Sequence, residues 1–131
     1  TVLLPVQVPG AMLHVGDGHA AQGDAEVCGV AVEVPTRGTM TTELIKARTI
    51  GTPRVESDDY IMAVGSARPM EDAARIAFYE LVTWLEADYG VERLMAYQLC
   101  SQVARVRLAN MVDILYSIVA KFPKRYLPQT R

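Results

Sequence analysis

The sequence lacks the features that mark several large classes of protein. Its 131 residues include two cysteines, one tryptophan and two histidines. Cys28 and Cys100 stand far apart in unlike contexts, without the paired spacing of a zinc ribbon or a disulfide framework. This cysteine usage predicts a reducing, cytoplasmic setting. No apolar run approaches the ~20 residues of a membrane span, and the first residues lack the charged and apolar regions of a signal peptide.

The sequence also lacks a concentration of charge of one sign. The formal net charge is -2, and the basic residues are scattered along the chain. The sequence therefore predicts no nucleic-acid partner and no membrane partner, and it favours a small molecule as the ligand. What remains is ordinary globular composition, 50% hydrophobic and 21% charged. This composition predicts a single domain over residues 1–131.

The start of the chain is unusual. Thr1 opens directly into an apolar, strand-like run over residues 2–8, without an initiator Met. This start suggests a fragment, a processed subunit or one domain of a larger enzyme. Because an unpaired strand offers free backbone groups, we expect association with a missing N-terminal segment or with a second copy of the chain.

Local patterns predict an α+β fold, with short strands packed in sheets and two consecutive helices in the second half. A helix is expected over residues 69–89, because apolar residues recur there at helical spacing between Pro69 and Gly90, which suit a first turn and a C-terminal cap. A shorter helix is expected over 92–101. Apolar or alternating runs predict strands at 2–8, 12–15, 27–34, 40–50, 60–64, 104–108 and 114–122.

One loop, residues 16–26, concentrates residues that can bind metals. It reads Gly-Asp-Gly-His-Ala-Ala-Gln-Gly-Asp-Ala-Glu. In an extended segment, residues two apart face the same side, so Asp17 and His19 can point at one metal ion. Asp24 and Glu26 repeat this spacing, so one can complete the metal shell while the other acts as general base or orients His19. The residue types leave a second interpretation open, in which the loop is a turn whose aspartates bind backbone amides.

A resemblance to a known family bears on this choice. Residues 4–11 (Leu-Pro-Val-Gln-Val-Pro-Gly-Ala) and 15–29, which contain the Gly/Asp loop, resemble the signature of the acetamidase/formamidase family. Residues 53–58, the helix after Pro69, and Pro123-Lys124 resemble it too, so the likeness covers nearly the whole chain. Family members are longer, and their N-terminal half contributes further site residues.

The resemblance implies the catalytic C-terminal portion of an amidase that hydrolyses short amides such as formamide and acetamide to the acid and ammonia. It implies a divalent metal, with zinc preferred and calcium as the alternative, and a homo-oligomer. Asp17 and His19 are the implied metal ligands, and Glu26 and Asp24 the implied catalytic residues. The alternative is a non-catalytic domain or subunit that completes a site only with a partner chain.

Two departures from the family pattern concern the surroundings of the loop. Family members commonly have glycine where this chain has Ala25, and alanine restricts the loop if that position needs a positive φ. Residues 104–107 (Ala-Arg-Val-Arg) stand where many members have a Gly-Asp pair.

Other candidate residues have simpler explanations. Cys28 can be proposed as a nucleophile, but its place in an apolar run predicts a buried, unreactive thiol. His14 is expected to be structural and half-buried. The acidic cluster at residues 56–59 can bind calcium or simply face solvent. Arg105 and Arg107 can receive a carboxylate product, or they can face solvent and pair with acids.

Overall fold

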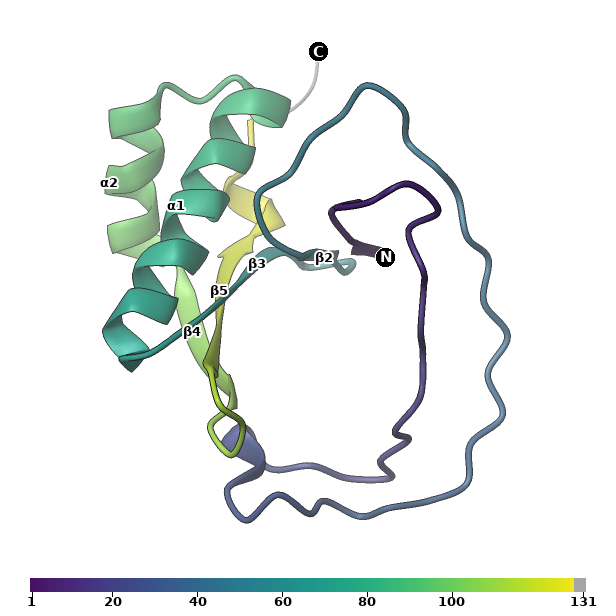
Figure 1. Ribbon diagram of the computed structural model, residues 1–131. Helices are drawn as coiled ribbons and strands as arrows, with labels where there is room; N and C mark the ends of the chain where they lie inside the picture. Colours follow the sequence, from purple (N-terminus) through teal and green to yellow (C-terminus); the bar gives the residue numbers. More distant parts are fainter. Residues whose placement is uncertain (129–131) are drawn as a thin grey trace.

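The computed structural model describes residues 1–128 and contains a five-stranded antiparallel sheet in the order β1-β2-β3-β5-β4. Helices α1 (Met70–Tyr89) and α2 (Arg93–Val103) lie side by side and cover one face of this sheet (Figure 1). The predicted α+β class is confirmed. The strands are β1 (Val2–Leu3), β2 (Arg54–Glu56), β3 (Tyr60–Ala67), β4 (Arg105–Asn110) and β5 (Tyr116–Pro123), and two short 3-10 turns are η1 (Asp24–Glu26) and η2 (Lys124–Tyr126).

The limits of α1 follow from its local sequence. Pro69 occupies the N-cap, and Gly90 ends the helix in the left-handed conformation, with φ 65°, while its N–H bonds to carbonyls of the last turn. The predicted helix over 69–89 is confirmed within one residue. The second helix begins after Glu92, whose side chain accepts from the N–H of Met95 and so caps the first turn.

The core lies between the sheet and α1. Ile61 of β3, Leu81 and Leu85 of α1, and Phe122 of β5 have no exposed surface. Alternate residues of β3 are buried, as expected for a strand with one face on the core. At Gly65 of β3 the helix comes so close that an added Cβ would lie 2.0 Å from the carbonyl oxygen of Ala73. This close approach fixes how α1 sits on the sheet.

Residues 4–53, which we call the arm, leave this body and return to it in a long open course (Figure 1). The strands predicted at 12–15 and 40–50 do not form, so these predictions are wrong. Of the strand predicted at 2–8 only β1 is present, and of the one predicted at 27–34 only a single bridge at Glu33. Within residues 1–128, no layer covers the apolar residues that suggested strands. They are exposed instead: Leu4, Val6, Val8, Met12, Leu13, Val15, Val27, Val30, Val32, Met40, Leu44 and Ile45.

The end of the arm is fastened to α1 and the sheet. Strand β2, which the charged sequence did not predict, pairs with β1 and β3. Arg54 at its start is 3% exposed and bonds through Nε to Glu80 of α1 at 2.7 Å. Arg48 also pairs with Asp88 of α1. None of the helices that the structure describes is long and apolar enough to cross a membrane.

Candidate metal and catalytic site

Two segments of the arm run antiparallel and create the candidate site. The N–H of Ala20 donates to the carbonyl of Val32 at 2.9 Å, and the N–H of Val34 donates to the carbonyl of Gly18 at 3.1 Å. This pairing sets His19 directly opposite Glu33. Side chains of directly opposed residues in an antiparallel pair lie close on one face, so the backbone pairing brings a carboxylate to the imidazole.

Gly18 has a steric reason to be glycine. A Cβ added at this position would lie 2.2 Å from Cγ2 and 2.5 Å from Oγ1 of Thr36. Thr36 therefore packs directly on the Gly18 backbone and closes one wall of an open surface pocket that Asp17 and Glu33 also line. A larger residue at position 18 would separate the two segments and break the opposition of His19 and Glu33.

Three acidic side chains surround Nε2 of His19. Oδ1 of Asp17 and Oε2 of Glu33 each lie 3.1 Å from this nitrogen. Oε1 of Glu26 lies farther away, at 3.8 Å. The His19 side chain is 13% exposed and that of Glu26 is 14% exposed, whereas Asp17 is largely open to solvent. The site is thus a half-buried imidazole at the edge of the surface, with carboxylates on one side.

The other ring nitrogen fixes the orientation of His19. Nδ1 lies 2.7 Å from Oε1 of Gln22, and because a carboxamide oxygen only accepts, Nδ1–H is the donor. That tautomer leaves a lone pair on Nε2, directed at the carboxylates. The Gln22 bond raises the pKa of His19 above its ordinary value; desolvation opposes this, and the charges of Asp17, Glu33 and Glu26 raise it further. Without a competing ligand the site therefore attracts a proton.

The grouping suits either a protonated imidazole paired with carboxylates or a bound metal ion. Nε2 is buried and has no hydrogen-bond partner, although two carboxylate oxygens lie 3.1 Å away. One ligand atom from each of Asp17, His19 and Glu33 lies within 4.8 Å of the others. In a tetrahedral shell at ~2.1 Å, ligand atoms are roughly 3.4 Å apart. One nitrogen and two carboxylate oxygens form a donor set that zinc accepts.

Glu26 reaches the site from an unusual backbone conformation. It ends η1, in which Ala25 has φ 73° and Glu26 has φ 47°, and the Ala25 side chain is buried. Position 25 thus adopts the positive φ for which glycine is the usual residue, so Ala25 holds the turn at a cost of about 1 kcal/mol. Glu26 itself faces Nε2 of His19.

Asp24 lies at the same turn but faces another partner. Its Oδ1 accepts from Nε of Arg107 at 3.0 Å and also from the terminal guanidinium nitrogen of that residue. The structure thus brings Asp17, His19 and Glu26 together and directs Asp24 towards β4. The interpretation of Arg107 as a partner of an acid is confirmed.

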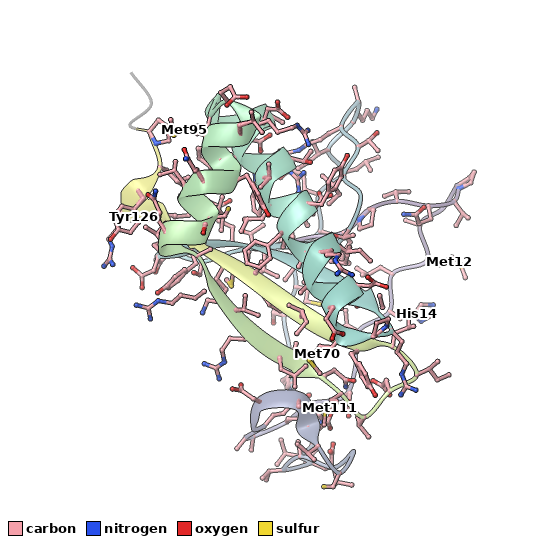
Figure 2. All side chains as sticks on the ribbon, turned by 90° about the vertical axis from the view of Figure 1, so that its left-hand side faces the viewer. Met12, His14, Met70, Met95, Met111 and Tyr126 are labelled. Carbon is pink, nitrogen blue, oxygen red and sulfur yellow. The ribbon has the colours of Figure 1, made fainter. Side chains whose placement is uncertain are left out.

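The remaining candidates lie outside this cluster. Cys28 was predicted to be buried and is exposed, as are the apolar residues beside it, Val27 and Val30. His14 is also exposed rather than half-buried, and Figure 2 places it on the arm, apart from the turn formed by η1. Glu56 of the acidic cluster pairs with Lys124.

Comparisons with known proteins match both the sequence and the fold of this chain. A family model described as the Acetamidase/Formamidase family matches residues 1–125. The chain belongs to the acetamidase/formamidase family. An acetamidase from Yersinia enterocolitica is 49% identical and matches 98% of this chain with a TM-score of 0.94. An acetamidase from Bacillus halodurans is 28% identical and matches 95% of it, with a TM-score of 0.78. The search of curated proteins gave no match.

These matches also bear on the arm and on the length of the chain. Because the match to the Yersinia protein covers 98% of this chain, it includes the arm. The chain spans 39% of the Yersinia protein and 42% of the Bacillus protein. A recombinant predicted acetamidase/formamidase from Thermoanaerobacter tengcongensis is 22% identical, with a TM-score of 0.69 over 82% of this chain, and supports the fold alone.

Sequence reasoning missed Glu33 and Gln22 as members of the site. Glu33 lay in a run predicted to be a strand, and its alignment with His19 depends on which residues pair across the arm. Pairing the predicted strand with the Gly/Asp loop was the signal that could have found it. Gln22, not Asp24, holds the ring of His19. The family match concerns the chain as a whole, so the roles of Asp17, His19, Glu26 and Asp24 remain predictions.

Proposed function

We propose that the chain supplies the metal-binding and proton-transfer groups of an amidase that hydrolyses short linear amides to a carboxylic acid and ammonia. The observation that carries this proposal is the unpartnered Nε2 of His19 between the carboxylates of Asp17 and Glu33. Membership of the acetamidase/formamidase family favours amides as the substrate class.

In this proposal Asp17, His19 and Glu33 hold a divalent metal ion. Zinc suits the donor set, whereas calcium takes oxygen ligands and makes no use of an imidazole nitrogen. When bound, the metal supplies Lewis-acid polarisation of the amide carbonyl and lowers the pKa of water beside it. Gln22 keeps the His19 ring in the tautomer that offers Nε2.

Glu26 acts as the general base. Its carboxylate is 3.8 Å from Nε2 of His19, farther than the two proposed ligands, so in this proposal it is the acid that remains to act on a water molecule. Glu26 takes a proton from this water as the oxygen attacks the amide carbon. The carbon–nitrogen bond then breaks, and Glu26 passes the proton to the departing nitrogen, giving the acid and ammonia.

The test measures metal stoichiometry and ammonia release from short amides on the same preparation. We expect Glu26→Gln to retain metal and to lower turnover by about a hundredfold or more, because general acid–base help contributes ~10²–10⁴. Glu43→Gln, an exposed acid elsewhere on the arm, is the matched control and should change neither property. Loss of metal together with turnover would instead make Glu26 a ligand, and unchanged turnover would refute its role as base.

A second function is favoured by the exposed apolar side chains of the arm. In it, the chain completes a site only with another polypeptide, which covers residues such as Val30 and Val32 next to Glu33. Metal binding without turnover by the chain alone, followed by turnover after addition of the rest of the Yersinia acetamidase, would support this function. Full turnover by the chain alone would exclude it.

The setting of this chemistry is part of the same proposal. Both cysteines in the described part of the chain are free thiols, which suits the reducing environment of the cytoplasm. A small amide is the proposed substrate, and homo-oligomerisation is the proposed mode of assembly.

A further inference from the structure

The turn that carries Glu26 is held in an unfavourable conformation by contacts from outside the turn. Ala25 and Glu26 both have positive φ, a conformation that is unfavourable for residues other than glycine. Consecutive residues in this region persist only where surrounding structure determines them. Within residues 1–128, the contacts that do so come from β4 and the connection that follows it.

Three contacts join the turn to the hairpin that β4 and β5 form with their connection. The N–H of Met111 donates to the carbonyl of Ala25 at 2.9 Å. Arg107 of β4 binds Asp24 through two nitrogens. At Gly29, with φ 79°, a Cβ would lie 2.9 Å from Cγ2 of Val112. Figure 2 shows Met111 at the end of the hairpin, next to η1.

The turn is closed internally as well. The N–H of Gly29 donates to the carbonyl of Glu26 at 2.8 Å, and the N–H of Glu26 donates to the carbonyl of Gly23 at 3.3 Å. Glu26 therefore lies between two anchored positions, one at Asp24 and Ala25 and one at Gly29. The Glu26 backbone, from which its carboxylate reaches His19, cannot shift without displacing the turn from these contacts.

We propose that Asp24 and Arg107 form a positioning pair, which fixes η1 on β4 so that Glu26 stays beside His19. The role in turnover rests on the proposed function, whereas the restraint on the turn does not. The pair differs from a catalytic residue, because Asp24 points to β4, where two guanidinium nitrogens of Arg107 share its Oδ1, and not to His19. Two charge-assisted hydrogen bonds from one guanidinium to this oxygen restrict where the Asp24 side chain can lie.

If Asp24 and Arg107 act as a pair, removing either side chain should have the same effect on kcat, which a double-mutant cycle tests. We expect Asp24→Asn and Arg107→Gln each to lower kcat by about tenfold, since small displacements of a reacting group cost ~10–10² in rate. KM and metal content should stay near wild type, because the proposed ligands lie on other segments. The double variant should be no worse than either single variant, and Arg107→Lys should recover part of the loss.

A second readout does not depend on activity. Hydrogen exchange at the amides of Gly29 and Met111 reports directly on the bonds to the turn, and both single variants should exchange faster there by about tenfold. Arg105→Gln is the matched control, because Arg105 is also exposed on β4 and forms no ion pair within residues 1–128. It should leave both kcat and exchange unchanged.

The outcomes separate this proposal from the proposed function. Loss of kcat in Asp24→Asn but not in Arg107→Gln would overturn the pair and make Asp24 catalytic in its own right. Unchanged exchange in both variants would also overturn it. Coupled changes in exchange, in a wild type that stays inactive even after addition of the rest of the Yersinia acetamidase, would support the pair's restraint on the turn and refute the amidase function.

Discussion

At the scale of single residues, Glu33 provides the most direct test of the metal site. Removing the side chain in Glu33→Ala leaves only Asp17 and His19, and we expect metal affinity to fall by more than about a hundredfold. Residues that merely support a ligand already cost ~10–100-fold when changed, so a direct ligand should cost more. Titration with zinc and a competing chelator measures this, and Glu43→Ala is the control. Full affinity in Glu33→Ala would remove Glu33 from the metal shell.

The two cysteines differ in reactivity for reasons that are visible in the structure. Cys28 is exposed, whereas burial raises the pKa of Cys100 to about 11. Because a raised pKa keeps the thiol protonated, Cys100 should not form a thiolate at pH 8. We expect a thiol reagent to modify one cysteine per native chain rapidly and the second only after unfolding. Rapid loss of two thiols, with the Cys28→Ser variant still reacting, would contradict this.

At the scale of elements, α1 holds the end of the arm through a buried ion pair. Glu80 of α1 and Arg54 of β2 are 4% and 3% exposed, and Arg54 also stacks 4.9 Å from the Trp84 ring centroid. Removing one partner leaves an uncompensated buried charge, so Glu80→Ala should lower the free energy of unfolding by about 3–5 kcal/mol. Urea unfolding measures the loss. Glu71→Ala, at an exposed position of the same helix, should cost less than about 1 kcal/mol.

At the scale of the whole molecule, the arm presents apolar side chains that the described part of the chain does not cover. Val8 and Met12 are 53% and 71% exposed. Clusters of this kind favour association, so we expect the chain to form oligomers at micromolar concentration. Sedimentation should show a shift towards monomer in Val8→Ser/Met12→Ser. Leu94→Ser, at an exposed position on α2, should leave the distribution unchanged. A monomer in the wild-type chain would contradict the expectation.

The sequence alone determined those parts of the protein that depend on neighbours along the chain. Helix α1 was predictable because its apolar period, Pro69 and Gly90 act within a few residues of one another. Asp17 and His19 lie together as their spacing suggested, although Asp17 has φ 59° and not the extended conformation on which that prediction was based. The sequence also raised the question of whether position 25 needs a positive φ, and in the structure Ala25 has one.

Tertiary structure decided the remainder. Apolar runs in the arm suggested strands, but a strand requires a partner and a layer, and within residues 1–128 most of the arm has neither. Glu33 joined the site only through its register with His19, and Asp24 turned to β4 because Arg107 lies there. These positions depend on contacts between residues far apart in sequence, whose pairing local patterns do not specify.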